Sequence, residues 1–445
     1  MYSRGVKPTA DATREGESAR MGRARPGVVA LFADARAVYA PIPLVDGVLE
    51  LGRGALESVG LGDDSVSRQH ASVAFDGRRW SICDHDSRNG TFADGERVSG
   101  ERVSAGIRVL RLGRTVFLLA SDLGALEGGV TTTGGHVAGP SLRAAWEAID
   151  RAAGSGDTLH LVGETGAGKE IAARRFHASG PRPKGPFVAV NCAAIPEGLA
   201  ERLLFGAVKG AFTGASADAT GYVQAADGGT LFLDEVAELD ARVQATLLRV
   251  LEAREVLQLG SSRPRPVTLR LCSATHADLR AAVSADRFRA DLYFRIGRPD
   301  IRLPPLRERP EEIVHLLARA TAELDAGLAP HATLVEACLL RPWPGNVREL
   351  LSEAKRAAGE ARARGRAVVL PEDLGPSAGA AFASKEEESE PAAAPAATDI
   401  ETALREAQGN VTAAARALRV HRNQLRRWIT RHGIDPLRFA SVSES

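Results

Sequence analysis

Residues 158–170, Thr-Leu-His-Leu-Val-Gly-Glu-Thr-Gly-Ala-Gly-Lys-Glu, decide the fold of the central part of this 445-residue chain. The apolar run from Thr158 to Val162 predicts a buried strand, and a helical pattern follows the glycines. Strand, glycine-rich loop and helix in this order predict a phosphate-binding loop, because glycine backbones let N–H groups face phosphate oxygens and the helix N-terminus adds positive charge. The predicted nucleotide-binding residues are Gly163, Glu164, Thr165, Gly166, Ala167, Gly168, Lys169 and Glu170.

A second segment, which is acidic, completes the predicted nucleotide site. Asp234 and Glu235 end the apolar run Leu231-Phe232-Leu233. Asp234 is expected to hold Mg²⁺ and Glu235 to orient the attacking water, while Lys169 holds the β- and γ-phosphates. Adjacent acids at a strand end can also be a solvated loop start, but together with the lysine loop they predict hydrolysis of ATP.

The surrounding pattern predicts a multidomain chain. Apolar runs at 187–190, 230–233 and 267–272 alternate with helical patterns, which indicates a parallel sheet covered by helices. Residues 310–370 are wholly helical in pattern and predict a helical unit after this sheet. Short alternating runs between turn signals at 27–121 predict an all-β sandwich. A small all-α unit closes the chain.

Composition limits the remaining possibilities. The formal net charge is +1, so nucleic-acid binding would need a local basic patch. Four separated cysteines without a CxxC pair argue against zinc and disulfides and fit a reducing cytoplasm. The sequence has neither an apolar run of the ~18 residues that a membrane span needs nor a signal peptide. We therefore expect a cytoplasmic protein.

Between the two halves of the nucleotide site lies a small apolar hexapeptide, which is a poor fit to a hydrophobic core. The order of the three segments resembles the AAA+ activators of sigma-54 RNA polymerase, whose GAFTGA loop contacts the sigma factor. Glu170, in place of Ser or Thr, is also usual in that family. Ala207-Val208 replace the family's frequent His-Glu, which puts an acidic loop contact in doubt. The resemblance implies sigma-54 contact by Gly210, Ala211, Phe212, Thr213, Gly214 and Ala215.

The same resemblance assigns further site residues. Arg289 and Arg295 match the family's arginine-finger segment, which reaches the neighbouring subunit's nucleotide and implies a ring, with a hexamer expected; local pairing with Asp286 or Asp291 is the alternative. Three other positions correspond to a residue that restrains Glu235, to sensor I and to sensor II. They are Asn191, His276 and Arg348.

The β segment resembles a forkhead-associated (FHA) domain, a reader of phosphothreonine peptides. Its signature is carried by Gly52-Arg53, Ser67-Arg68-Gln69-His70 and Ser87-Arg88-Asn89-Gly90-Thr91. A phosphate dianion needs a fixed cation and short loop donors. The residues expected to bind the phosphopeptide are Arg53, Ser67, Arg68, Arg88 and Asn89. A sandwich in which Arg53 and Ser67 merely pair locally, or one that has lost phosphate binding, remains an alternative.

The C-terminal unit is Ala-rich and basic, with no acid between Val411 and Gly433. It resembles the Fis-type helix-turn-helix of sigma-54 activators and supplies the local basic patch that the chain otherwise lacks. Base or phosphate contacts are expected from His421, Arg422, Asn423, Arg426, Arg427 and Arg431. A solvated basic helix that binds no DNA is the alternative.

These patterns predict six segments: a disordered tail (1–26), an FHA domain (27–122), a linker (123–137), an AAA+ domain (138–375), a disordered linker (376–397) and a helix-turn-helix (398–436). The expected function is ATP-driven activation of sigma-54 RNA polymerase from upstream DNA, controlled by a phosphothreonine protein. Two other functions stay open: a protein-remodelling ATPase with an incidental basic tail, and a phosphopeptide adaptor with an inert nucleotide fold.

Overall fold

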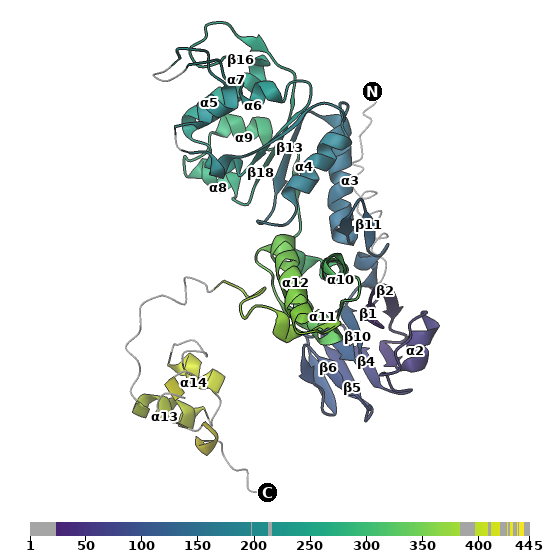
Figure 1. The fold of residues 1–445 in the computed structure, drawn as a ribbon. Helices are drawn as coiled ribbons and strands as arrows, with labels where there is room; N and C mark the ends of the chain where they lie inside the picture. Colours follow the sequence, from purple (N-terminus) through teal and green to yellow (C-terminus); the bar gives the residue numbers. More distant parts are fainter. Residues whose placement is uncertain are drawn as a thin grey trace, which may run out of the picture. The chain divides into compact units, whose positions relative to one another are not determined.

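The structure is a computed structural model that describes residues 24–196, 198–211, 216–382, 397–407, 411–418, 425, 428–429, 434 and 436–439. The chain divides into two compact units, Met1–Ala381 and Phe382–Ser445. The first holds a β-sandwich, an α/β body and a helical lid (Figure 1). Among the described residues, no helix is long and apolar enough to cross a membrane.

The β-sandwich consists of two antiparallel sheets, with strand orders β2-β1-β10-β9-β6-β7 and β3-β4-β5-β8. Its core lies between the sheets and includes Trp80, Ile82 and Phe117. The elements are β1 (Gly27–Ala33), β2 (Arg36–Pro43), β3 (Val48–Leu51), α2 (Arg53–Ser58), β4 (Ala71–Phe75), β5 (Trp80–Asp84), β6 (Thr91–Ala93), β7 (Glu96–Arg97), β8 (Glu101–Ser104), β9 (Val109–Leu112) and β10 (Thr115–Ala120).

Two strands of this sandwich depart from the predicted alternation. Every residue of β1 and of β10 is buried, so both faces of the six-stranded sheet are covered there. The continuous apolar runs Val28 to Phe32 and Val116 to Leu119 are the sequence signal for such a strand. An antiparallel sheet commonly leaves one face in water, which is why alternation was expected.

The segment expected as a linker contains structure of its own. A 3₁₀ turn, η1 (Leu123–Leu126), precedes a hairpin of β11 (Thr131–Thr133) and β12 (His136–Ala138). Val137 and Ala138 are buried. The hairpin leads directly into α3 (Pro140–Ser155) of the α/β body.

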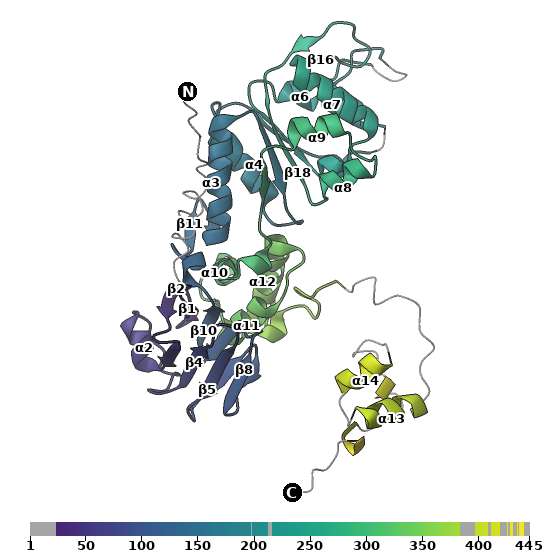
Figure 2. The ribbon, with the colours of Figure 1, turned by 180° about the vertical axis from the view of Figure 1, so that it is seen from behind.

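The α/β body, in which Figure 2 labels strand β18, is built on a parallel sheet of order β14-β15-β18-β13-β19. The strands are β13 (Thr158–Val162), β14 (Phe187–Asn191), β15 (Thr230–Asp234), β18 (Arg270–Thr275) and β19 (Asp300–Arg302). β18 begins three residues after the start of the predicted 267–272 run, although Val267 and Leu269 before it are also buried. The other main elements are α4 (Lys169–Ala178), η2 (Cys192–Ala194), α5 (Ala200–Phe205), α6 (Tyr222–Ala225), η3 (Val236–Glu238), α7 (Ala241–Ala253), β16 (Glu255–Val256), β17 (Arg265–Pro266), α8 (Leu279–Ser284) and α9 (Ala290–Ile296).

The helical lid comprises α10 (Glu311–Leu324), α11 (Ala332–Leu340) and α12 (Asn346–Ala363). Short pieces complete it: η4 (Leu306–Glu308), the paired β20 (Ala329–Pro330) and β21 (Val368–Val369), and η5 (Pro371–Asp373). Trp343 is fully buried in the lid, and its indole N–H donates to the Cys338 carbonyl over 2.8 Å. Gly379 lies against the Trp343 ring, so the start of the expected second linker packs on the lid.

The second unit contains α13 (Ala397–Glu406), α14 (Val411–Ala417) and η7 (Pro436–Phe439). Ile400, Leu404, Leu425 and Ile429 form its small apolar core. Leu425 and Ile429 lie between the arginines of the basic segment, yet both side chains are buried. The fold prediction of a β-sandwich, a P-loop α/β body with a lid and a helical C-terminal unit is confirmed.

Candidate nucleotide-binding and recognition sites

The carboxyl ends of the parallel strands bring the phosphate loop, the acidic pair, Asn191 and His276 together. Residues 162 and 275 are paired across β13 and β18, and Asn191 is paired with Asp234 across β14 and β15. The phosphate loop, the acidic pair and His276 each follow one of these strands directly. They meet at one edge of the sheet, the edge at which open α/β sheets bind ligands.

The phosphate loop has the backbone geometry that its glycines permit. Gly166 and Gly168 have φ values of +76° and +109°, a region that L side chains rarely adopt. A Cβ atom at Gly166 would overlap the carbonyl of Gly345 in the lid. The loop ends where α4 begins at Lys169, so the first turn of that helix faces the loop.

Lys169 lies at the centre of the charged residues. Its side chain is buried, and its Nζ donates to Glu235 Oε1 over 3.0 Å and to the Gly163 carbonyl over 3.1 Å. Asp234 Oδ1 is 3.8 Å from the same Nζ. Glu235 itself has a left-handed backbone, with φ of 54°. The ammonium group thus holds both acids at the strand end.

His276 fixes the second oxygen of Glu235. The distance from its Nδ1 to Glu235 Oε2 is 2.7 Å. Burial would raise the pKa of Glu235, but hydrogen bonds from Lys169 and His276 outweigh it and lower the pKa. Burial dominates at Asp234 and raises its pKa despite Lys169. Glu235 is therefore held as the carboxylate that a water-orienting role requires.

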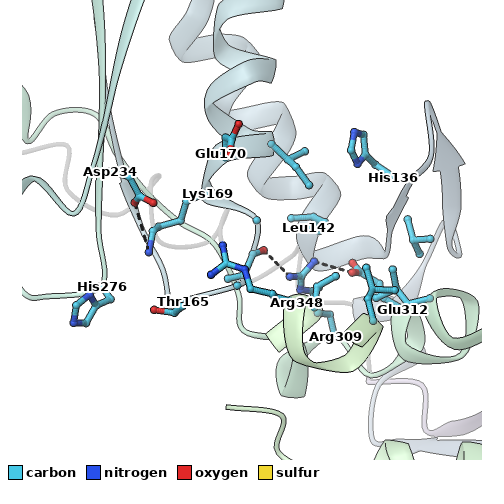
Figure 3. A pocket seen from close by; sticks show the side chains of 18 of the residues that line it. His136, Leu142, Thr165, Lys169, Glu170, Asp234, His276, Arg309, Glu312 and Arg348 are labelled. Atoms are coloured by element: carbon cyan, nitrogen blue, oxygen red, sulfur yellow. Dashed lines mark hydrogen bonds and ion pairs between the residues drawn. The ribbon is translucent and has the colours of Figure 1, made fainter. Parts of the chain in front are cut away.

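A cavity of about 660 Å³ joins this edge to the lid. Figure 3 shows Lys169 and Asp234 on one side of it and Arg309 and Arg348 of the lid segment on the other. Predicted residues that line it are Thr165, Gly166, Ala167, Gly168, Lys169, Glu170, Asn191, Asp234, Glu235, His276 and Arg348. The first two loop residues, Gly163 and Glu164, do not line the cavity, and the Gly163 N–H donates to the Thr275 carbonyl over 3.2 Å.

Several lining residues were not predicted from the sequence. Arg309 is buried and donates to the Ala167 carbonyl of the loop and to Glu312, over 2.8 and 2.7 Å. In the sequence, only the charged run at 307–312, where a helical pattern begins, indicates that Arg309 and Glu312 could belong to a site. An apolar end of the cavity is formed by Val137, Leu142, Trp146 and Leu316. Such a wall suits the flat face of a base.

The lid is hydrogen-bonded to the phosphate loop through Asn346. This residue is fully buried with φ of 53°, and its Nδ2 donates to the Thr165 carbonyl and to Glu164 over 3.0 and 3.1 Å. Arg307 forms a two-bond ion pair with the same Glu164, and this hydrogen bonding lowers the pKa of Glu164. Arg348, two residues further along α12, reaches the cavity from this junction.

Three predicted residues have other local partners. Asn191 Oδ1 accepts from the Ala193 N–H, and no Asn191–Glu235 hydrogen bond occurs between these two described residues. Arg289 pairs with Asp291, one of the local partners considered from the sequence. Arg295 donates to the Leu251 carbonyl over 3.0 Å. Neither arginine lines the cavity of its own chain.

The hexapeptide begins at the end of a short braced segment. Ala207 pairs with Ala219, and the Lys209 N–H donates to Asp218 over 2.7 Å, so the two sides of the loop are joined at its base. Gly210 and Ala211 belong to the described residues, and Ala211 packs on Gly260. Phe212, Thr213, Gly214 and Ala215 lie outside the described residues.

The predicted phosphopeptide residues converge on Ser67. The Arg53 N–H donates to the Ser67 carbonyl over 3.0 Å, and the Arg88 N–H donates to Ser67 Oγ over 3.2 Å. Asn89 donates to the Ser65 carbonyl over 2.6 Å. Arg68, Arg88 and Asn89 are exposed. The three motifs therefore form one loop surface on which the arginines Arg68 and Arg88 are exposed.

Fixed polar residues lie beneath this loop surface. The buried His70 accepts from the Ser67 N–H at Nδ1 and lies 3.3 Å from the Gly90 carbonyl at Nε2, so it links two of the loops. The Arg53 guanidinium is held by the Asp64 and Val66 carbonyls.

The six predicted DNA-contacting residues, from His421 to Arg431, fall outside the described residues.

Comparison with known proteins agrees with this geometry. Residues 136–302 match the sequence model of the sigma-54 interaction domain, residues 49–113 that of the FHA domain, and residues 400–432 that of the bacterial regulatory protein Fis family. The transcriptional regulatory protein XylR of Pseudomonas putida is 48% identical over 224 residues, 49% of this chain and 39% of XylR. The nitric oxide reductase transcription regulator NorR2 of Cupriavidus necator is 41% identical over 312 residues, 66% of this chain and 60% of NorR2.

A solved structure also matches. The crystal structure of NtrX from Brucella abortus is 26% identical, with a TM-score of 0.50 over 66% of this chain and 68% of NtrX. Fold and family matches thus define a P-loop AAA+ protein that carries an FHA sandwich and a Fis-family helix-turn-helix. The chain contains a sigma-54 interaction domain, an FHA domain at its N-terminal side and a Fis-family unit, and it is similar to transcriptional regulators such as XylR and NorR2. It spans 39% and 60% of the lengths of XylR and NorR2.

Proposed function

We propose that this protein hydrolyses ATP to remodel a sigma-54 RNA polymerase complex at a promoter, bound to upstream DNA through its C-terminal unit. The observation that carries the proposal is the joining of Lys169, Asp234, Glu235 and His276 at one sheet edge, opposite Arg348 of the lid. An inert nucleotide fold would have no need for this constellation.

The cavity fits a magnesium nucleotide. Gly166 and Gly168 leave the loop free of side chains where phosphates would lie, and Lys169 needs only to exchange protein oxygens for phosphate oxygens. Asp234 is suited to hold Mg²⁺, which usually takes one or two carboxylates together with phosphate oxygens and water. When bound, the ion neutralises charge between the β- and γ-phosphates.

The protein residues then have distinct tasks in the hydrolysis. Glu235 accepts a hydrogen bond from the attacking water, whose oxygen bonds to the γ-phosphorus as the bond to the ADP oxygen breaks. His276 and Lys169 hold both Glu235 oxygens in place. Arg348 stabilises the transferred group from the lid. The products are ADP, phosphate and a proton.

We further infer that the active form is a ring, with a hexamer expected. Arg289 and Arg295 line no part of the cavity of their own chain, although they lie on and before α9 of the same body. This supports their delivery to a neighbouring subunit's nucleotide, where an arginine can contribute strongly to the rate. The ion pair between Arg289 and Asp291 would open on assembly.

The remaining parts supply input and output. The braced base at Ala207 and Ala219 supports presentation of Phe212 and Thr213 to sigma-54. The Ser67-centred loops suit a phosphothreonine, since exposed arginines and backbone donors bind a phosphate dianion. The basic C-terminal helices would anchor the protein to upstream DNA.

The first experiment measures ATP hydrolysis by the full chain and by Lys169→Ala. We expect turnover that the substitution abolishes, with Lys184→Ala, an exposed lysine of the same body, as the matched control. Equal turnover in wild type and Lys169→Ala would refute the assignment of the nucleotide site.

The second experiment measures transcription from a sigma-54 promoter in cells with and without sigma-54. Output should require sigma-54 and Thr213, and it should respond to Arg53→Ala if phosphate recognition controls it. Output that ignores Thr213→Ala and sigma-54 would favour a protein-remodelling ATPase instead.

A further inference from the structure

The six-stranded sheet of the FHA domain is buried on its outer face as well as in the sandwich. Val29, Leu31, Val116 and Leu118 belong to a different apolar cluster from the sandwich core. The partners in that cluster come from the lid, with Ile313 and Leu317 of α10, Val335 and Leu339 of α11, and Leu350 of α12. The FHA domain and the ATPase lid therefore share one hydrophobic core.

A buried ion pair crosses the same junction. Arg111 of β9 donates from Nε to Glu336 Oε2 of α11 over 2.6 Å, and these side chains are only 11% and 6% exposed. The other oxygen, Glu336 Oε1, accepts from the Gly95 N–H of the FHA domain over 3.1 Å. Burying either charge without the other costs free energy. The ion pair therefore opposes a partial separation of the FHA domain from the lid.

The parts joined in this way also form walls of the nucleotide cavity. Glu312, Leu316 and Arg319 of α10 line it, and so do Gly135 and His136 of the hairpin that leads from the FHA domain. Arg319 donates to the Gly135 carbonyl and ties hairpin and lid together. Lys169, Asp234 and Glu235 line the cavity from the α/β body.

The phosphopeptide loops are in turn fixed to the strand that carries Arg111. Ser65 accepts from Asn89 at its carbonyl and from the Arg114 N–H at Oγ. Arg114 follows Gly113, whose carbonyl accepts from the Arg111 guanidinium over 3.3 Å. The recognition loops and the lid junction thus belong to one hydrogen-bonded frame.

We propose that the FHA domain and the lid form a single rigid body, and that nucleotide sets the orientation of this body relative to the α/β body. The proposal rests on nucleotide binding in the cavity. Binding of a phosphothreonine partner that favours one orientation then changes nucleotide affinity, and nucleotide changes affinity for the partner by the same factor. The contact between the FHA domain and the lid is then the point at which the FHA domain acts on the ATPase.

The test uses distances between spin labels in the full chain. Labels are introduced by Asp76→Cys in the FHA domain, Ser352→Cys in the lid and Arg249→Cys in the α/β body, all at exposed positions. The background carries Cys83→Ser, because Cys192, Cys272 and Cys338 are buried. Double electron–electron resonance is recorded with and without ADP and Mg²⁺, and binding of a fluorescent ADP is measured on the same samples.

We expect one narrow distance between labels 76 and 352 that ADP does not change, and a distance between labels 76 and 249 that ADP shifts. A broad or ADP-dependent 76–352 distance would overturn the rigid body. An unchanged 76–249 distance with ADP bound would overturn its nucleotide control. Absence of ADP binding would instead contradict the proposed function, and the nucleotide-free 76–352 distance would still test the rigid body.

The ion pair provides a second measurement. Glu336→Ala should broaden the 76–352 distance, because Arg111 is left buried without its partner. Glu96→Ala, which removes an exposed acid that pairs with Arg102 within the FHA domain, is the matched control and should leave the distance narrow. A narrow distance in a folded Glu336→Ala protein would contradict the role of the pair.

Discussion

Glu311 offers the sharpest quantitative prediction. It begins α10 and is 1% exposed, and neither carboxyl oxygen has a hydrogen-bond partner among the described residues. Burial raises its pKa to about 7, and the neighbouring acid Glu312 adds to this, while Arg309 and Arg143 oppose it. Burial, together with the charge of Glu311, raises the pKa of Tyr39, from β2 of the FHA domain, to about 12. Glu311→Gln should therefore relieve a buried charge at the meeting point of lid, α3 and FHA domain.

The sign and size follow from proton linkage. Since the folded pKa lies above the ordinary 4.5, the folded protein binds more protons between pH 4.5 and 7, and stability falls as pH rises through that range. The difference between about 7 and 4.5, at about 1.4 kcal/mol per pKa unit, corresponds to about 3.5 kcal/mol. Glutamine stays neutral, so at pH 8 the variant should gain up to this amount over wild type, whereas at pH 4.5 the ionisation effect vanishes.

Urea unfolding followed by tryptophan fluorescence between pH 5 and 8 measures this difference, because Trp343 lies in the lid core. Glu323→Gln changes an exposed acid of the same helix and should leave the pH dependence of wild type unaltered. If the Glu311→Gln and wild-type stabilities differ by the same amount at every pH, Glu311 ionises as freely in the folded as in the unfolded chain, and the reasoning from burial is refuted.

Three further predictions concern the sites. Glu235→Gln should lower kcat for ATP about 10²- to 10⁴-fold while ADP affinity is kept, and equal losses in both would contradict its assigned role. Asn346→Ala should destabilise the lid by about 1–3 kcal/mol in thermal unfolding, since buried donors lose their partner, and an unchanged Tm would contradict this. Gly52→Ala should weaken capture of a degenerate phosphothreonine-peptide library about tenfold, because its Cβ would overlap the Arg68 carbonyl; Gly54→Ala has open space and is the control, and equal capture by both would count against the loop assignment.

Local sequence patterns were sufficient to predict which residues meet at the carboxyl edge of the sheet. The phosphate loop, Asp234-Glu235 and His276 each follow an apolar strand, and a parallel sheet places the carboxyl ends of its strands at one edge. Side chains at or next to these strand ends therefore meet at this edge, independently of how the other domains of the chain fold. The FHA motifs behave similarly, since loops at one end of a sandwich lie close together.

Contacts between remote segments could not be predicted in this way. Arg309, Glu312 and the hairpin residue His136 line the nucleotide cavity only because the lid and the hairpin fold over it. The Arg111–Glu336 pair joins residues 225 positions apart, and neither position has a motif around it. The apolar runs of β1 and β10 indicate that both sheet faces are covered, but not by what. Periodicity reports whether a residue is buried, whereas the identity of its neighbour depends on how whole elements pack.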